Sequence, residues 1–305
     1  MTPAMTAVTT AEVAAHRAAR RARWLPHLTG WGFVLPATLV IVGLSVFPAV
    51  WALLLSLQDG DLLTGGSYVG LRNYADLMGD AELAAATGHT LLYTVLFVPG
   101  SVALGLLLAL ALNLRIRLIG FYRTCFFVPY VVSAAATGIL ANFVFDPDFG
   151  IVNAALKAVG LPPMGFLQDP DQAMLTLVVI SIWGGVGMPA VVYLAALQDI
   201  PRELVEAARV DGGSGRHVLR HVVLPQLRPA TVFLVIWQTI TALQLFDLVY
   251  TTTKGQPLDS TTTVVFYLYR QAFQLFHSGY GTAIAYVLFL VTLAVSGAVL
   301  WRSAR

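Results

Sequence analysis

The chain alternates between long apolar stretches and shorter polar segments. Six stretches hold about 20 predominantly apolar residues, the number that a helix needs to cross a bilayer. They lie near residues 31–57, 91–112, 122–145, 174–197, 230–250 and 281–301. Several prolines fall inside them or near their ends, which spans tolerate because neighbouring helices satisfy the freed backbone groups. The pattern predicts an all-α integral membrane protein with six transmembrane helices.

The most polar and most basic segment between two spans covers residues 201–228. Pro201 suits the first turn of a helix over 202–210. The helical pattern stops at Asp211-Gly212-Gly213, where glycine tolerates backbone angles that other residues avoid. It resumes over 216–224 and ends at Pro225. A helix, a sharp turn and a second helix outside the membrane form a shape that can dock into another protein.

The first 30 residues are rich in alanine and arginine, and the apolar run that follows is longer than the core of a signal peptide. We interpret residues 1–30 as a cytoplasmic N-terminal tail and residues 31–305 as one six-span membrane domain.

The distribution of basic residues predicts the orientation. With the N-terminus inside, fourteen of the eighteen Lys and Arg residues fall in cytoplasmic segments, and only Arg72, Lys157, Lys254 and Arg270 fall outside. The positive-inside rule therefore places both termini and the 201–228 segment in the cytoplasm. The outer loops are long and acidic, with Asp76, Asp80 and Glu82 in the first. They are either solvated loops or a rim that receives an extracytoplasmic protein.

Composition supports a membrane protein, since 57% of the residues are hydrophobic and 11% charged, with a mean hydropathy of +0.75. About 25% would be charged in a soluble domain. Neither of the two lysines, Lys157 and Lys254, follows a glycine or precedes Ser or Thr. The chain therefore lacks the usual phosphate-binding loop, and ATP-driven work requires a separate subunit.

Metal and acid–base chemistry have little support in the sequence. His217 and His221 have the spacing of metal ligands, but no acidic or cysteine partner is near, so a basic helix face is the favoured interpretation. A proton-driven secondary carrier would place ionisable residues in its spans, and only Asp247 lies in one. A membrane enzyme is disfavoured because no nucleophile–base pair or metal constellation is present. We expect no catalytic residue, no metal and no nucleic-acid partner.

Polar residues inside the spans are the candidates for substrate contact. The fifth stretch holds a series at three-residue spacing: Gln238, Thr241, Gln244 and Asp247. Their amide, hydroxyl and carboxylate groups can form hydrogen bonds with the hydroxyl groups of a substrate. For Gln238, a hydrogen bond between helices is an equal alternative. In the fourth stretch, Trp183 is a candidate contact. The glycines beside it either open the backbone to a cavity or pack helices closely. Tyr250 adds a partly polar aromatic face.

The 201–228 segment resembles the EAA loop of permease subunits of bacterial binding-protein-dependent ABC importers. The matching residues are Glu206, Ala207, Ala208, Asp211, Gly212, Leu224 and Pro225. The chain departs from the family pattern at Gly213, where Ala is common, and at Leu219, where Phe is common. Residues 120–155 and 245–250 are similar to the maltose-permease-like branch, and residues 260–273 are similar to both sugar and glycerol-3-phosphate permeases. Residues 253–257 depart from that branch.

The resemblance implies a permease subunit of an importer for a carbohydrate or related polyol, in the bacterial cell membrane. The alternative within the family is an importer of glycerol-3-phosphate or a glycerophosphodiester. The implied partners are a second permease subunit, an ABC ATPase dimer that binds ATP and Mg, an extracytoplasmic solute-binding protein and membrane lipid. The implied mechanism is alternating access. Glu206 would contact the ATPase, and Gly212 would set the turn of the coupling loop.

Overall fold

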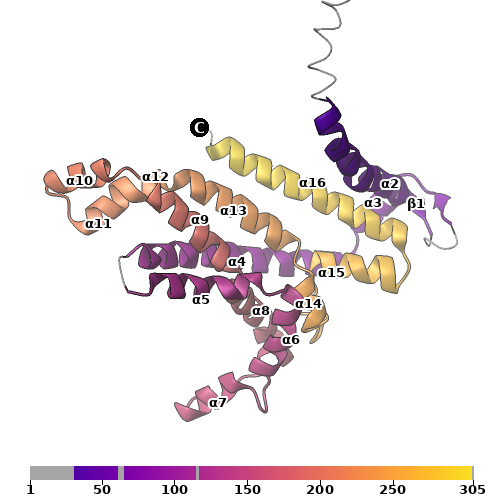
Figure 1. Ribbon diagram of the computed structural model, residues 1–305. Coiled ribbons are helices and arrows are strands. Elements are labelled where there is room, and N and C mark those ends of the chain that lie inside the picture. The colour runs from indigo at the N-terminus through magenta and orange to yellow at the C-terminus, as the bar shows by residue number, and fades with distance from the viewer. Residues whose placement is uncertain (1–30, 61–64, 115–116, 304–305) are drawn as a thin grey trace, which may run out of the picture. The chain divides into compact units, whose positions relative to one another are not determined.

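A computed structural model describes residues 31–60, 65–114 and 117–303 of the protein (Figure 1). The predicted tail, residues 1–30, lies outside these ranges, and so do its four arginines. Arg115 and Arg305 lie outside them as well. The chain divides into two compact units, with the boundary between Leu55 and Ser56.

The described part of the first unit, residues 31–55, corresponds to the predicted first span. The helix runs over Trp31–Ser56, one residue past the boundary, with a π-helical segment η1 at Val42–Val46 followed by α2 at Phe47–Ser56. The helix is long and apolar enough to cross a membrane, and its most apolar 18-residue window has a mean hydropathy of 2.3. The described part of this unit therefore agrees with the prediction of a span over 31–57.

The second unit is helical apart from a two-stranded antiparallel sheet, in which Gln58 pairs with Tyr68 and Asp59 with Ser67. Its elements are β1 (Gln58–Asp59), β2 (Ser67–Tyr68), α3 (Arg72–Leu77), α4 (Ala81–Leu112), α5 (Ile119–Val131), α6 (Ala134–Val144), α7 (Ile151–Ala158), η2 (Phe166–Gln168), α8 (Pro170–Gly185), α9 (Gly187–Gln198), α10 (Arg202–Val210), α11 (Gly215–Val218), η3 (Leu219–Val223), α12 (Leu224–Gln226), α13 (Arg228–Leu243), α14 (Asp247–Thr251), α15 (Val264–Tyr269), η4 (Arg270–Gln274) and α16 (Ser278–Ser303).

Helix α4 is the central element of this unit and packs against α8, α9 and α13 (Figure 1). Its buried residues recur every three or four positions, which is the period of one helix face. That side comprises Ala86, Thr90, Tyr93, Phe97, Ser101, Gly105, Ala109 and Leu112. Near one end, Ala109 and Leu112 join a core with Tyr193 of α9 and Leu234 of α13. The middle of α4 packs against α8 through Tyr93 and Phe97.

Helix α4 begins at Ala81, ten residues before the predicted span. The Asp80 carboxylate accepts hydrogen bonds from the backbone N–H groups of Glu82 and Leu83, at 2.9 and 3.0 Å. Such an N-cap satisfies donors that have no partner within the helix. Sequence hydropathy located the apolar part of the helix, whereas the cap decides where the helix starts.

The predicted third span, 122–145, is a bent pair rather than one helix. Helices α5 and α6 meet at 99°. Pro129 lies in the last turn of α5, Val132 is extended, and the Ser133 hydroxyl accepts a hydrogen bond from the Ala136 N–H at 3.2 Å. Proline weakens the end of one helix and the serine cap starts the next. The fourth span, 174–197, also bends, by 45° at Val186, between the residues where the sequence indicated a Gly/Pro break.

The predicted fifth span, 230–250, is also interrupted. Helix α13 ends at Leu243, and α14 starts only at Asp247. Among the described residues, three single helices are long and apolar enough to cross a membrane, and five spans result if each bent pair counts as one. The all-α membrane fold is confirmed, while the count of six spans stays a prediction.

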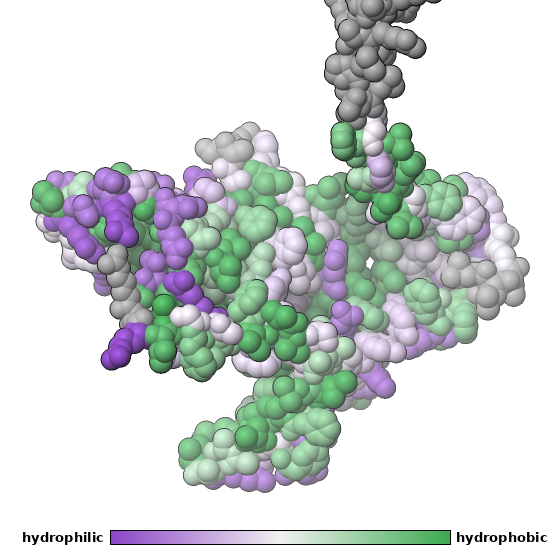
Figure 2. All heavy atoms as spheres, viewed as in Figure 1, coloured by the Kyte–Doolittle hydropathy of each residue, from purple (hydrophilic) through white to green (hydrophobic). Residues whose placement is uncertain are grey.

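The surface of the second unit separates by polarity. Figure 2 shows hydrophilic residues gathered over α10 and α11. Large apolar side chains face outward along the long helices, for example Leu107, which is 63% exposed, and Phe289, which is 58% exposed. Contiguous exposed apolar surface is unfavourable in water but suits a lipid environment. The spans therefore present apolar surface to lipid, and α10 and α11 stand apart as a polar element.

Candidate functional site

The 201–228 segment has the helix, sharp turn and second helix that its sequence predicts. At the end of α10, the Asp211 N–H donates to the Ala207 carbonyl at 3.0 Å and the Gly213 N–H donates to the Ala208 carbonyl at 2.9 Å. Gly212 has φ +82°, a left-handed conformation that glycine adopts without strain. A Cβ on Gly213 would lie 2.5 Å from the Ala208 carbonyl oxygen, so this tight turn also explains glycine where the family commonly has alanine.

The second half of the segment is less regular than predicted. The Ser214 hydroxyl caps α11 by accepting from the His217 N–H at 3.3 Å, and π-helical η3 then carries the chain to Leu224. The rings of His217 and His221 stack with centroids 4.2 Å apart. In the described part of the chain, no group of three or more His, Cys, Asp or Glu residues could hold a metal ion.

Most residues that match the EAA pattern are accessible. Ala208 is half-buried, while exposed positions are Glu206, Ala207, Asp211, Gly212, Leu224 and Pro225. Two apolar side chains of α10 are also exposed, Val210 to 87% and Leu204 to 43%. Exposed apolar groups on an otherwise charged helix form a surface suited to a partner protein.

A cavity of about 310 Å³ lies within the second unit, between α4, α5, α6, α8 and the break that follows α13. Seven of its lining side chains carry hydroxyl, amide or carboxylate groups: Tyr93, Tyr130, Thr137, Ser181, Thr241, Gln244 and Asp247. None of its described lining residues is Lys, Arg or His. The cavity therefore offers neutral donors and acceptors, aromatic faces and one carboxylate.

Gln244 and Asp247 both line this cavity, but they do not share a helix face as their three-residue spacing suggests. Gln244 follows the last residue of α13, and Asp247 opens α14. The irregular backbone between them is held by the Thr263 hydroxyl, which donates to the Leu245 carbonyl at 2.8 Å. Both side chains are exposed, and neither makes a side-chain hydrogen bond to another described residue. Their polar groups are therefore available to a ligand.

Gln238 lies in a contact between two helices rather than at the cavity. It is 4% exposed, and its Nε2 donates to the Ser101 hydroxyl of α4 at 2.5 Å. It does not line the cavity. The hydrogen bond between α13 and α4 agrees with the second interpretation of Gln238, a helix–helix contact.

Trp183 and Tyr250 also lie away from the cavity lining. Trp183 faces a separate apolar cavity of about 280 Å³ beside α6. Tyr250 stacks on Phe246, with centroids 5.4 Å apart, and meets the edge of Tyr269 at 5.5 Å. The neighbouring glycines divide between the two predicted roles. Gly184 and Gly185 line the cavity, whereas Gly187 packs closely against α5.

Several lining residues were missed in the sequence, namely Tyr93, Tyr130, Thr137 and Ser181. They come from four different helices, so no spacing within one segment connects them. A weak signal existed for Tyr130, which directly follows Pro129 at the bend between α5 and α6.

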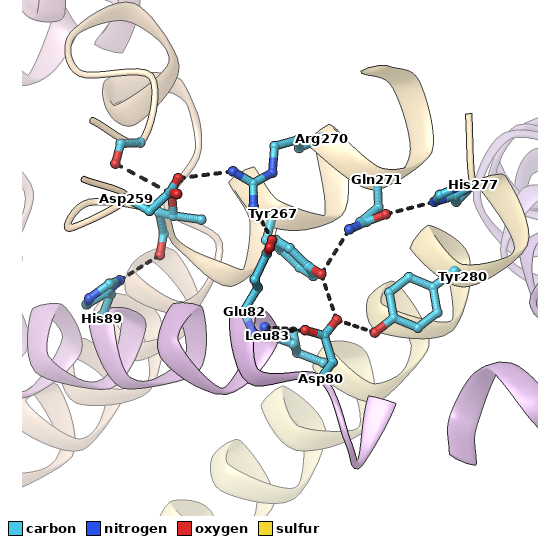
Figure 3. A network of polar contacts seen from close by, with 12 residues as sticks. Asp80, Glu82, Leu83, His89, Asp259, Tyr267, Arg270, Gln271, His277 and Tyr280 are labelled. Atoms are coloured by element: carbon cyan, nitrogen blue, oxygen red, sulfur yellow. Dashed lines mark hydrogen bonds and ion pairs between the residues drawn. The ribbon is translucent and has the colours of Figure 1, made fainter. Parts of the chain in front are cut away.

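A polar network connects the start of α4 to α15, η4 and α16 (Figure 3). The hydroxyls of Tyr267 and Tyr280 both donate to Asp80 Oδ2, the former at 2.6 Å. Arg270 pairs with Glu82 at 2.6 Å and with Asp259 at 3.0 Å. These contacts hold Asp80 and Glu82 of the first predicted outer loop in one fixed arrangement.

The network sets the ionisation of Asp80. Burial raises the pKa of the Asp80 carboxyl, but hydrogen bonds from Tyr267, Tyr280 and two backbone N–H groups outweigh it, so the pKa is lowered from its ordinary value. Donors that bond to the anion favour the charged form. Asp80 therefore stays an acceptor for both tyrosines at neutral pH.

Comparison with known proteins identifies the fold and the family. Residues 101–302 match the sequence profile of the family described as binding-protein-dependent transport system inner membrane component. The chain is 35% identical to the lactose transport system permease protein LacF of Rhizobium radiobacter, over 88% of this chain and 92% of that protein. It is 30% identical to the sn-glycerol-3-phosphate transport system permease protein UgpA of Pectobacterium atrosepticum, over 90% of this chain and 92% of that protein. A crystal structure of a bacterial ABC transporter that imports the acidic polysaccharide alginate has the same fold, with a TM-score of 0.83 at 22% identity, covering 93% of this chain and 98% of that chain.

Proposed function

The chain belongs to the family of binding-protein-dependent transport system inner membrane components, and we propose that it imports a carbohydrate or related polyol as a transmembrane permease subunit. The observation that carries the proposal is the cavity of neutral polar and aromatic groups around Gln244 and Asp247. Hydroxyl groups bond to amides, hydroxyls and carboxylates, and aromatic rings supply flat apolar faces.

The lining of the cavity favours this substrate class over the alternative of glycerol-3-phosphate or a glycerophosphodiester. The relative UgpA favours that alternative by its name. A phosphate group, however, is usually bound by Arg or Lys, and the described lining of the cavity contains neither, while Asp247 would repel an anion. A neutral hydroxylated substrate therefore suits the cavity better.

Transport of this kind requires partners. We propose that an ABC ATPase dimer, with its own ATP and Mg, docks on the 201–228 loop, and that an extracytoplasmic binding protein delivers the substrate. A second permease chain completes the pathway. The exposed Leu204 and Val210 and the turn at Gly212 support docking of the ATPase on this loop. ATP-driven closure of the ATPase pair would move the loop, and the spans would turn with it to give alternating access.

The substrate contact is tested by uptake measurements after the substrate has been found by screening the cognate binding protein against sugars and sugar phosphates. Gln244→Ala leaves one polar group of the bound substrate without a hydrogen-bond partner, which weakens the binding free energy by about 1–3 kcal/mol. Subsaturating uptake should fall roughly tenfold, with basal ATP hydrolysis and assembly unchanged. Gln168→Ala, another exposed glutamine that does not line the cavity, is the matched control.

Asp247→Asn tests the charge separately, because it keeps the shape of the side chain and removes the anion. A neutral sugar should tolerate this change better than a cationic substrate would. Wild-type uptake by both Gln244→Ala and Asp247→Ala would show that the substrate site lies elsewhere.

A further inference from the structure

A second and larger cavity, of about 970 Å³, lies between the 201–228 loop and the nearby ends of α4, α5 and α9. One face of α10 lines it, through Arg202, Val205, Glu206 and Arg209. Their spacing of three or four residues places these side chains on the same side of the helix. Arg123 of α5 also lines the cavity. The cavity therefore separates the loop from the membrane helices.

The charges in this cavity are not paired with one another. Three arginines and Glu206 line it, which leaves two positive charges in excess. None of the four forms an ion pair with a described residue. Arg209 and Arg202 are exposed. The cavity lining therefore has a positive charge in excess, which favours the entry of an acidic group.

Arg123 carries the clearest sign of a missing partner. Its Nη2 donates to the Leu112 carbonyl, at the end of α4, at 3.1 Å. Its Nε is buried and has no hydrogen-bond partner among the described residues. An unsatisfied buried donor is costly, and more so on a charged group. The guanidinium fork matches phosphate oxygens, which accept from two N–H groups at once.

The remaining lining is mostly apolar, with the amides of Asn113 and Gln198 as the exceptions. Nine of the sixteen lining residues are Leu, Ile or Val, among them Leu110, Leu114 and Ile119 at the ends of the membrane helices. The described lining has no aromatic side chain on which a nucleotide base could stack. Aliphatic walls combined with unpaired arginines suit a ligand that has both an acyl chain and an anionic head.

We propose that this cavity binds an anionic phospholipid, with the phosphate at Arg123, Arg202 and Arg209 and an acyl chain along the aliphatic wall. The lipid would fill the space between the membrane helices and the loop on which we propose that the ATPase docks. Lipid composition would therefore affect how firmly the loop is held. The binding itself does not depend on the ATPase, so it can be measured on the permease chain alone.

The test uses the purified full chain in a neutral detergent, with native mass spectrometry as the readout. Dioctanoyl-phosphatidylglycerol should bind and dioctanoyl-phosphatidylcholine should bind much more weakly. Arg123→Gln should weaken phosphatidylglycerol binding roughly fivefold, the effect of one basic residue near an anionic headgroup. Arg220→Gln removes an exposed charge from the same loop outside the cavity and should leave binding unchanged.

Arg202→Gln provides a second variant, because Arg202 is exposed and its loss does not break the bond to the Leu112 carbonyl. It should weaken binding to a similar extent. Equal binding of the two lipids, or an equal loss in Arg220→Gln, would overturn the proposal. Competition by inorganic phosphate at the same concentration as phosphatidylglycerol would overturn it too, since the site would then bind free phosphate rather than lipid. If the proposed docking of the ATPase on this loop proved wrong, the measured lipid binding would still stand, because it is measured on the permease chain alone.

Discussion

Tyr267 shows how one hydroxyl holds distant parts of the chain together. It is 2% exposed, donates to Asp80 and accepts from Gln271 Nε2 at 2.9 Å. Because the folded-state pKa of Asp80 is lowered, its contribution to stability is fully present above its unfolded-state pKa of about 3.9. That contribution is lost as the pH falls through the lower folded-state pKa. At neutral pH the network is therefore at full strength.

We expect Tyr267→Phe to lower the free energy of unfolding by about 1.5 kcal/mol, the value of a hydrogen bond to a charged acceptor. Denaturant unfolding of the purified chain in a fixed detergent at pH 7 measures it. Tyr68→Phe is the control, since Tyr68 is 76% exposed. Equal stability of the two variants would mean that the Asp80 network contributes nothing.

At the scale of residues, the sequence identified part of the cavity. Thr241, Gln244 and Asp247 could be predicted because polar groups in an apolar stretch are costly and need a reason. Gln238 met the same criterion but bonds to Ser101, because sequence spacing does not tell a cavity from a neighbouring helix. Tyr93 and Ser181 could not be predicted, since only the packing of α4 against α8 brings them together.

At the scale of elements, hydropathy located the helices but not their ends or bends. The start of α4 depends on the Asp80 cap, and the 99° bend depends on Pro129 and Ser133. An apolar window averages over such local features. The break after Leu243 is least visible in the sequence, because it is stabilised by the distant Thr263 hydroxyl. The turn of the 201–228 segment was predictable, since its glycines are a local signal.

Gly212 and Gly215 allow the turn to be tested by a matched pair. A Cβ on either would meet no atom within 4 Å, but only Gly212 has a positive φ. A non-glycine residue in the left-handed conformation costs about 1–2 kcal/mol. Gly212→Ala should therefore speed hydrogen exchange of the amides at 211–214 by roughly fivefold to thirtyfold. Gly215→Ala should not. Equal exchange in both variants would contradict a strained turn.

At the scale of the whole molecule, orientation remains a prediction from the charge distribution. Both termini and Arg209 should lie in the cytoplasm, and Asp76 and Asp169 outside. After replacement of Cys125, single cysteines at these sites can be labelled in intact cells with an impermeant reagent. Positions 76 and 169 should react and position 209 should not. Ready labelling at 209 with none at 76 would reverse the topology.

We propose that ATP hydrolysis by a partner drives transport by this chain through the 201–228 loop. The most direct measurement compares substrate uptake and substrate-stimulated ATP hydrolysis in the reconstituted importer, with wild type, Glu206→Lys and Glu203→Lys. Glu203 lies on the same helix outside the matching motif and serves as the control. Glu206→Lys should insert normally but uncouple hydrolysis from uptake, while Glu203→Lys should transport as wild type does. Uptake and stimulated hydrolysis at wild-type levels in Glu206→Lys would contradict the account.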